Sequence, residues 1–149
     1  METGMNWRLT PQLEEGAVSK NAANYSPLVL AYLGDAVYEL YIRGLLVSAG
    51  NLPVNQLHKA ATGYVKAKAQ SDAITALEPE LTEEELRIYK RGRNAKPATI
   101  PRHADVSDYH RATGFEALAG YLYLCGQTDR LNRLFSLAVE TLNKKLSLL

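Results

Sequence analysis

The chain has 149 residues, a net charge of +1 and a 46% share of hydrophobic residues, a composition typical of one folded domain. Its single cysteine, Cys125, excludes an intrachain disulfide, and no apolar run reaches the roughly 18 residues that a membrane-spanning helix needs. Because the N-terminal stretch contains acids and no apolar core, it does not resemble a signal peptide, and we expect a cytoplasmic protein without membrane contact.

Residues 1–25 show no clear periodicity, and we expect them to form a flexible leader to a single domain over residues 26–149. Ser26 and Pro27 predict the start of a first helix, because serine favours the N-cap and proline favours the first helical position. This helix is expected to extend to about residue 48, since Gly50 is a typical helix end.

The middle of the chain predicts two further helical regions and a loop. The first region is expected to begin after Pro53 and to extend to about residue 77, with a break at Gly63. Residues 82–85, Thr-Glu-Glu-Glu, form a capping box, which predicts a helix that ends near residues 92–94. Two prolines and the absence of periodicity predict a loop over residues 95–104.

The C-terminal part of the chain predicts two more helices. One covers about residues 107–124 and ends at Gly126. The last is amphipathic, with one apolar face made of Leu131, Leu134, Phe135, Ala138, Val139, Leu142 and Leu146. No segment of the sequence alternates as a strand does, so the predicted fold class is all-α.

The first helix is apolar on every side over residues 28–47, which is typical of a central, buried helix. Its only charges, Asp35, Glu39 and Arg43, are four residues apart and therefore form one narrow stripe. A buried carboxylate is costly unless it is paired or binds a metal. Two interpretations remain open: an internal ion pair with Arg43, or a functional site that faces the stripe.

A second lone acid lies near the C-terminus. Residues 112–124 contain a single charge, Glu116, among apolar neighbours, and Gly114 and Gly120 predict close packing against other helices. If the two lone acids meet across a helix contact, their oxygens suit Mg²⁺, with Mn²⁺ as a substitute. The alternative is a Glu116 carboxylate that simply reaches the surface.

The stretches that contain these acids resemble two motifs of the ribonuclease III family. Residues 33–37, Leu-Gly-Asp-Ala-Val, match the signature helix and place Asp35 on the catalytic aspartate. Residues 116–123, with the pattern Glu-Ala-Leu-x-Gly-x-x-Tyr, match the second motif and place Glu116 on the metal-binding glutamate. The order and separation of the motifs also agree, and the resemblance covers about residues 26–140.

The resemblance implies a helical, homodimeric endonuclease that uses Mg²⁺ to cut double-stranded RNA and leaves 5′-phosphate ends. Ala31 and Thr113 replace two of the four carboxylates usual in the family, which predicts fewer metal ions in the site. We also expect no double-stranded RNA-binding domain after this one. Both departures resemble the short branch called Mini-ribonuclease III and imply maturation of the large-subunit (23S) ribosomal RNA precursor, with a ribosomal protein or the large subunit as a further candidate partner.

Glu39 is a further candidate for the site, because it lies one helical turn from Asp35 and offers a carboxylate in place of the one missing at Ala31. The simpler interpretation, which we favour, is that Glu39 pairs with Arg43.

Residues 87–111 carry a net charge of +5, which indicates a polyanion partner at one site. Part of this charge has a local explanation, because lysine and arginine are favoured at helix C-termini. An enzyme without a separate RNA-binding domain holds RNA with its catalytic domain. We therefore expect RNA contacts from Lys90, Arg91, Arg93, Asn94, Lys96 and Arg102.

Two other functions compete with the enzyme. One is a catalytically inactive, ribonuclease III-like assembly factor that binds ribosomal RNA, and the other is a helical protein-interaction domain. Lone acids on apolar helices favour the enzyme over the first, and the basic segment favours it over the second. A helix that is apolar on every face also needs more cover than a small domain provides, which favours a dimer.

Overall fold

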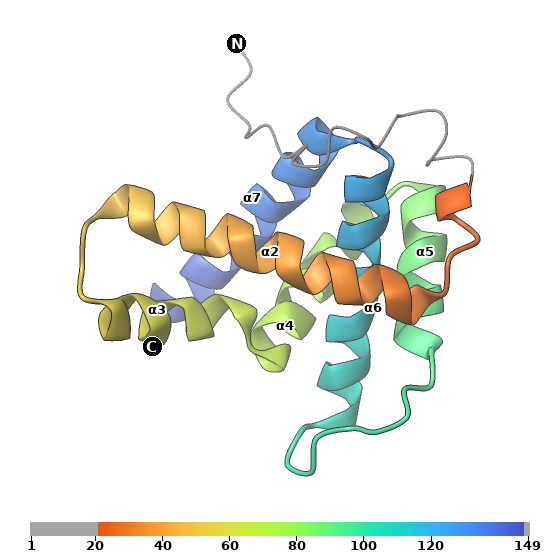
Figure 1. Ribbon diagram of the computed structural model, residues 1–149, viewed down its shortest axis with the longest axis horizontal. Helices are drawn as coiled ribbons and strands as arrows, with labels where there is room; N and C mark the ends of the chain where they lie inside the picture. The colour runs from red at the N-terminus through yellow and green to blue at the C-terminus, as the bar shows by residue number, and fades with distance from the viewer. Residues whose placement is uncertain (1–20, 148–149) are drawn as a thin grey trace.

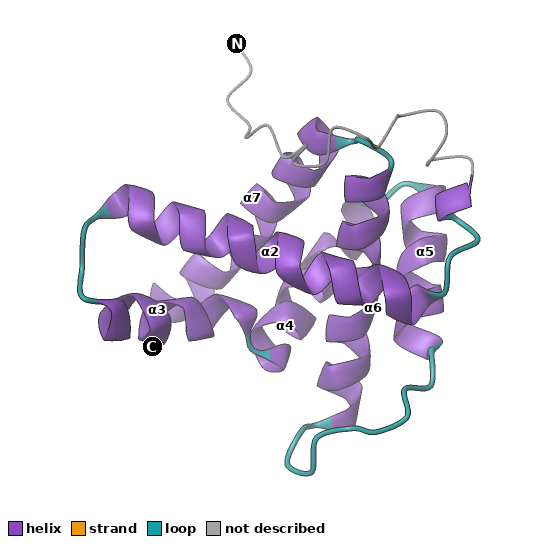
Figure 2. Cartoon of the chain, in the orientation of Figure 1, coloured by secondary structure: helices purple, strands orange, loops and turns teal. Residues whose placement is uncertain are grey.

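The computed structural model describes residues 21–147, which form six α-helices and one short 3-10 helix and contain no strand. The helices are α2 (Pro27–Ala49), α3 (Val54–Val65), α4 (Ala67–Leu77), α5 (Glu83–Asn94), α6 (Val106–Leu124) and α7 (Thr128–Ser147), and the 3-10 helix η1 (Glu78–Glu80) follows α4. Figure 1 shows their arrangement and Figure 2 the loops between them. The predicted all-α fold class is confirmed, and no helix within the described range is long and apolar enough to cross a membrane.

Local signals place most helix ends where the sequence predicts them. The Thr82 hydroxyl accepts a hydrogen bond from the Glu85 N–H at 3.1 Å, and the Glu85 carboxylate accepts one from the Thr82 N–H at 2.9 Å, which completes the capping box. Gly126 ends α6 with a φ of 71°, a conformation that favours glycine. These ends are set by residues within a few positions of one another.

The break between α3 and α4 falls at Lys66, so the predicted break at Gly63 is wrong. Gly63 lies within α3, whereas Lys66 adopts φ −64° and ψ 156°, which is open to any residue. The Gln70 side chain donates a hydrogen bond to the Val65 carbonyl at 2.8 Å and satisfies a group that the end of α3 leaves unpaired. The break therefore depends on a contact from the next helix and not on glycine.

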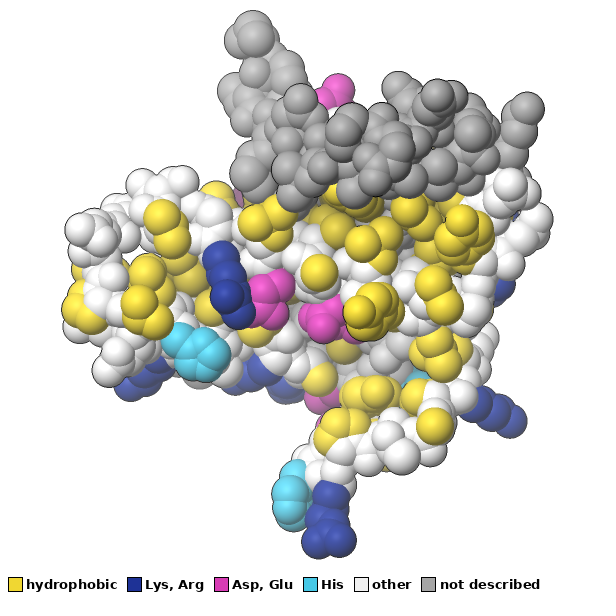
Figure 3. Space-filling model, in the orientation of Figure 1, with side chains coloured by type: hydrophobic (Ala, Val, Ile, Leu, Met, Phe, Trp, Pro, Cys, Tyr) yellow, Lys and Arg dark blue, Asp and Glu magenta, His cyan; other side chains and the backbone are white. Residues whose placement is uncertain are grey.

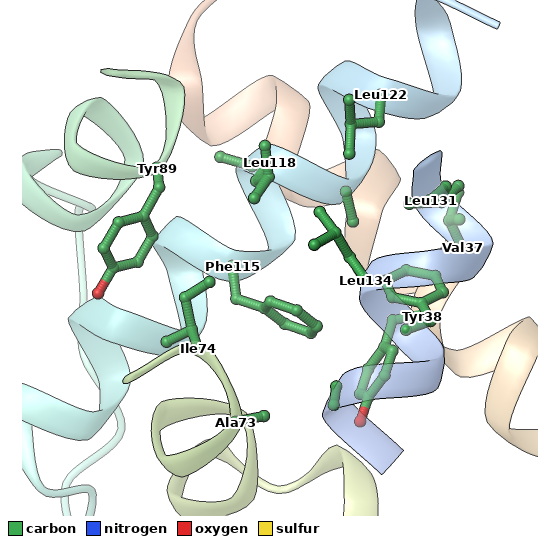
Figure 4. Packing of buried hydrophobic residues seen from close by; sticks show 14 of the residues in the cluster. Val37, Tyr38, Ala73, Ile74, Tyr89, Phe115, Leu118, Leu122, Leu131 and Leu134 are labelled. Atoms are coloured by element: carbon green, nitrogen blue, oxygen red, sulfur yellow. The ribbon is translucent and has the colours of Figure 1, made fainter. Parts of the chain in front are cut away.

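Helix α6 lies at the centre of the fold and packs against α2, α4, α5 and α7. In Figure 1, α2 crosses in front of α6 at a steep angle and α5 lies alongside α6. Within the core, the rings of Tyr38, Phe115 and Phe135 pack with centroids 5.0 to 5.9 Å apart, so that α2, α6 and α7 meet in one aromatic cluster. Figure 4 shows Tyr38 and Phe115 among the other buried hydrophobic residues.

Helix α2 is buried on one side only. Leu30, Tyr38 and Ile42 face the core, where other helices cover them. Five large apolar side chains of the same helix are exposed: Val29, Tyr32, Leu40, Leu45 and Val47. Tyr32 retains 85% of its exposure. Within the single chain, α2 is therefore not buried on every side as expected. The other helices of the chain cover only one face of α2.

Residues 21–25, the described part of the expected leader, lie against the helical body. Ala22 is fully buried, and the Arg91 guanidinium donates hydrogen bonds to the carbonyls of Ala23 and Tyr25. The packed part of the chain thus begins before Ser26, because an arginine from α5 holds this segment in place. The rest of the expected leader, residues 1–20, lies outside the described residues.

A buried ion pair joins the start of α5 to α7. The Glu85 carboxylate, which is largely buried, accepts hydrogen bonds from Arg130 Nε and Nη2, both at 2.8 Å. We expect Arg130→Met to lower the free energy of unfolding by about 3–5 kcal/mol, because it leaves a buried carboxylate without its partner. Urea unfolding measures this loss. The double variant Glu85→Gln/Arg130→Met should recover part of it, and a single-variant loss below about 1 kcal/mol, as for surface pairs, would contradict the assignment.

Candidate active site

Glycines bring α2 and α6 into direct backbone contact where the two helices cross. A Cβ atom at Gly34 would lie 1.7 Å from the Glu116 carbonyl oxygen, and one at Gly120 would lie 2.0 Å from the Leu30 carbonyl oxygen. No side chain fits between backbones this close, so the contact forms because both positions lack one. The crossing sets Asp35, which follows Gly34, beside Glu116.

A second glycine contact positions α5 against the same helix. A Cβ atom at Gly92 would lie 2.7 Å from the Ala117 Cβ, and one at Gly114 would lie 2.7 Å from the Tyr89 ring. The prediction that Gly114 and Gly120 mark close helix packing is therefore confirmed at both positions. As a result, the basic end of α5 is held against the helix that carries Glu116.

The two lone acids of the sequence meet at the crossing of α2 and α6. Asp35 is exposed and Glu116 is partly buried, and Asp35 is the neighbouring residue that raises the pKa of Glu116 most strongly. Figure 3 shows acidic side chains at the centre of this face, among apolar ones. Burial, together with the nearby charge of Asp35, raises the pKa of Glu116 to about 8. Among the described residues, neither acid forms an ion pair with a lysine, arginine or histidine, so the pair is an acidic centre without a cationic partner there.

Neither Glu39 nor the two positions that lack the family's usual acids, Ala31 and Thr113, adds an unpaired carboxylate to this centre. Arg43 donates hydrogen bonds from Nε and Nη2 to Glu39 Oε2, at 3.1 and 2.9 Å, which is the pairing that the spacing favours. Ala31 is buried, and Thr113 donates its hydroxyl hydrogen to the Tyr109 carbonyl at 2.9 Å. Glu39 is thus engaged by Arg43, although its charge still contributes to the raised pKa of Glu116.

Gln70, which no sequence motif singled out, contacts Glu116 from α4. Its Nε2 donates a hydrogen bond to Glu116 Oε2 at 3.1 Å, and the residue is only 3% exposed. Helical periodicity offered a signal, because Gln70 lies on the buried face of α4 in line with Ala73, Ile74 and Leu77. A polar residue within such a face is informative, since buried polar groups need partners.

The paired acids suit a hard divalent cation. Carboxylate oxygens are preferred ligands of Mg²⁺, which proteins hold through one or two carboxylates together with water and substrate phosphates. Within residues 21–147, no three side chains of the Asp, Glu, His or Cys type gather in one place, so the described part of the chain offers Asp35 and Glu116 alone. A cation bound here therefore takes its further ligands from water or from substrate phosphates.

The residues expected to contact RNA lie at the end of α5 and in the loop before α6. Four of them are exposed: Lys90, Asn94, Lys96 and Arg102. Arg93 is partly buried, and its guanidinium carbon lies 5.7 Å from the centroid of the Tyr89 ring. Arg91 binds backbone carbonyls of the same chain, so its guanidinium is already engaged. Figure 3 shows cationic side chains projecting from this loop, on the face that presents the acids.

The raised pKa of Glu116 predicts a pH-dependent stability of the metal-free protein. Because the pKa rises from 4.5 to about 8, the folded state holds a proton that the unfolded chain releases. Stability from this group is complete below pH 4.5 and is lost as the pH rises to about 8. At about 1.4 kcal/mol per pKa unit, we expect a loss of a few kcal/mol. Urea unfolding with a chelator at pH 5 and pH 8.5 measures it, and Glu116→Gln should remove it. Parallel pH profiles of the two proteins would contradict this expectation.

Phosphodiester hydrolysis in a nucleic acid needs acids that can hold a cation and protein cations that can hold phosphates. The fold and the site supply both, and together they define a helical endonuclease. Residues 28–127 match the Ribonuclease III domain, and the chain belongs to this family of endoribonucleases.

Similar proteins carry the name Mini-ribonuclease 3. The one from Thermoanaerobacter sp. (strain X514) is 51% identical over 119 residues, which cover 80% of this chain and 84% of that protein. The one from Brevibacillus brevis is 52% identical over 120 residues, which cover 80% and 88%. A crystal structure of a protein from Fusobacterium nucleatum is 34% identical, with a TM-score of 0.73 over 80% of this chain and 96% of that one. The resemblance to the short branch of the family is confirmed.

Proposed function

We propose that this endoribonuclease cleaves double-stranded RNA in a reaction that depends on a divalent cation, with Asp35 and Glu116 as its catalytic and metal-binding acids. The observation that supports this most strongly is the meeting of the two acids at the crossing of Gly34 and Gly120. A binding-only assembly factor has no use for two acids that raise the cost of folding by lying together. The cation is Mg²⁺, for which Mn²⁺ can substitute.

The two acids have different tasks because they differ in exposure. Glu116 is partly buried and anchors the cation from α6, whereas the exposed Asp35 faces the substrate and orients the attacking water. When bound, the cation offsets the negative charge that develops on the phosphate in the transition state. The water oxygen bonds to phosphorus and gives up a proton to solvent. The bond from phosphorus to the 3′ oxygen breaks and that oxygen takes a proton from solvent, so the products carry a 5′-phosphate and a 3′-hydroxyl.

The RNA duplex is held by the end of α5 and the loop before α6. Proteins bind double-stranded RNA mainly through phosphates and 2′-hydroxyls across the minor groove, which requires exposed cations and not base-specific contacts. Lys90, Lys96 and Arg102 are exposed for this purpose, Asn94 adds an amide, and Arg93 is steadied by the Tyr89 ring. Arg91 supports the site indirectly, because it is engaged with residues 23 and 25.

Removing cations from this segment should reduce the salt dependence of RNA binding. For the double variant Arg93→Ala/Lys96→Ala, we expect the slope of log affinity against log salt to fall by about 1 for each phosphate contact that is lost. Titration of a duplex RNA at several salt concentrations measures the slope in Ca²⁺, without cleavage. Lys145→Ala, which removes an exposed cation from α7, is the matched control and should leave the slope unchanged. An unchanged slope for the double variant would remove these two residues from the interface.

The protein acts as a homodimer, with one site in each subunit cutting one strand. The exposed apolar face of α2, made of Val29, Tyr32 and Leu40, supports this, because one chain leaves it uncovered. Asp35 is exposed on the same helix, so pairing through this face sets the two sites near one another. Sedimentation equilibrium should give twice the mass of the 16.5 kDa chain, and a single-chain mass at micromolar concentration would contradict the dimer.

We propose that the natural substrate is the large-subunit (23S) ribosomal RNA precursor, which the enzyme matures at both ends, with a ribosomal protein or the large subunit as a partner. The name shared by the relatives gives the enzyme and not its RNA, so this assignment depends on the resemblance to the short branch of the family. Ribosomal RNA maturation also calls for a cytoplasmic protein. Incubation with a long duplex RNA and Mg²⁺, beside a single-stranded RNA of the same sequence, tests the activity. Short duplex products are expected, and cleavage of the single strand alone would overturn the proposed substrate class.

A further inference from the structure

We propose that Gln70 is a positioning residue, whose buried amide keeps the Glu116 carboxylate directed at Asp35 and at the cation that the two acids bind. The inference rests on the function proposed above for Glu116. Gln70 is 3% exposed, so it reaches neither solvent nor RNA and acts through the acid that it contacts.

Two acceptors fix the orientation of the Gln70 amide. Its Nε2 donates one hydrogen bond to the Val65 carbonyl at 2.8 Å and another to Glu116 Oε2 at 3.1 Å. A reversed amide would set its oxygen against two acceptor oxygens, so the N–H groups have to face Val65 and Glu116. The Val65 carbonyl, which takes no part in the chemistry, therefore fixes the orientation in which the Gln70 N–H group faces Glu116.

These hydrogen bonds connect three helices. Val65 ends α3, Gln70 lies in the first turn of α4, and Glu116 belongs to α6. Lys66 is the one residue between α3 and α4, so the end of α3 and the start of α4 stay close together and leave the amide little freedom to move. The backbone contact at Gly34 places the main chain of Glu116, whereas Gln70 restrains the rotation of its side chain.

The amide supplies a donor without supplying a charge. A lysine or arginine at this position would neutralise Glu116 and compete with the cation for its oxygens. A neutral N–H stabilises the ionised carboxylate instead, and the hydrogen bond from Gln70 accordingly lowers the pKa of Glu116 against the larger effect of burial. The ionised form is the one that binds a cation.

The oxygen of the Gln70 amide indicates that fold stability alone does not explain why a glutamine occupies this position. Gln70 Oε1 is buried and has no hydrogen-bond partner among the described residues. A buried acceptor without a partner costs free energy, which an apolar side chain of similar size would avoid. The donor contact with Glu116 is the feature that such a side chain would lose.

The variant Gln70→Met tests the proposal, because methionine has a similar volume and no donor. We expect kcat for duplex RNA cleavage to fall about 10- to 100-fold with KM for RNA unchanged, as for other residues that orient metal ligands. Mn²⁺ binding to the RNA-free protein, measured by calorimetry, should weaken by about tenfold or more. Ser71→Ala, which changes a buried polar neighbour on the same helix, is the matched control and should alter neither quantity.

A double-mutant cycle shows whether Gln70 acts through Glu116. In a Glu116→Gln background, Gln70→Met should cause no further loss of Mn²⁺ binding. An equal further loss in that background, or wild-type Mn²⁺ affinity and kcat in the single variant, overturns the proposal. If Gln70→Met does not fold, Gln70→Asn, which keeps an amide but is one methylene shorter, takes its place with the same outcomes. Failure of the wild-type protein to cleave duplex RNA would overturn the proposed function instead, and the Mn²⁺ measurements would still decide the role of Gln70.

Discussion

Neutralising either acid at the crossing of α2 and α6 is expected to lower the rate of duplex RNA cleavage by about a hundred- to a thousand-fold or more. The variants are Asp35→Asn and Glu116→Gln, which keep the size of each side chain and remove its charge. In either variant the cation loses one of its two protein carboxylate ligands, because no third acid of the described residues joins the pair. Single-turnover cleavage of a labelled duplex in Mg²⁺ measures the rate.

The same substitutions should leave the fold intact. Burial and the charge of Asp35 both raise the pKa of Glu116, so the ionised acid is unfavourable in the metal-free protein. At pH 8.5 and without metal, Glu116→Gln is therefore expected to unfold at the same or a higher urea concentration than the wild type. Loss of activity with unchanged stability assigns the acids to catalysis, whereas an undiminished rate after either change would refute the proposed site.

Glu39→Gln is the matched control for charge on the same helix. Glu39 is one turn from Asp35, but it is partly exposed and paired with Arg43, and such pairs are worth at most about 1 kcal/mol. We expect the rate to change only a few-fold. A loss as large as that of Asp35→Asn would bring Glu39 into the site, where it would compensate for Ala31.

The glycine crossing carries the second large expected effect. In Gly34→Ala, the new methyl group would lie 1.7 Å from the Glu116 carbonyl oxygen, a backbone atom that cannot move without the whole of α6. Overpacking of this kind costs about 1–3 kcal/mol and more where backbone must shift, so we expect the free energy of unfolding to fall by at least that amount. Cleavage should fall about a hundred-fold even where the protein remains folded, because a misplacement of about 1 Å has this cost.

Gly44→Ala is the control for this prediction, because it makes the same change in the same helix. A Cβ atom at Gly44 would meet nothing within 4 Å, so the substitution should raise stability by up to about 1 kcal/mol through helix propensity alone. Thermal unfolding and the cleavage assay compare the two variants directly. Equal melting temperatures and equal rates would show that α2 and α6 do not need the close contact.

Local signals in the sequence determined where the helices begin and end. Ser26 and Pro27 start α2, the box of Thr82 and Glu85 starts α5, and Gly126 ends α6, as expected. The residues that form such a signal lie within about four positions of one another, so the sequence shows the whole signal without any knowledge of the fold. The two motifs likewise identified the family without knowledge of the fold, and they singled out Asp35 and Glu116 as the acids proposed for its site.

The tertiary structure alone decided which side chains surround those acids. Gln70 reaches Glu116 from α4, Arg91 turns back to hold residues 23 and 25, and the break after α3 falls at Lys66. Periodicity shows which face of a helix is apolar, but it does not show which other helix covers that face. Which helices pair depends on how the side chains of the whole chain pack together. Here α2 pairs with α6 because Gly34 and Gly120 let the two backbones come into contact.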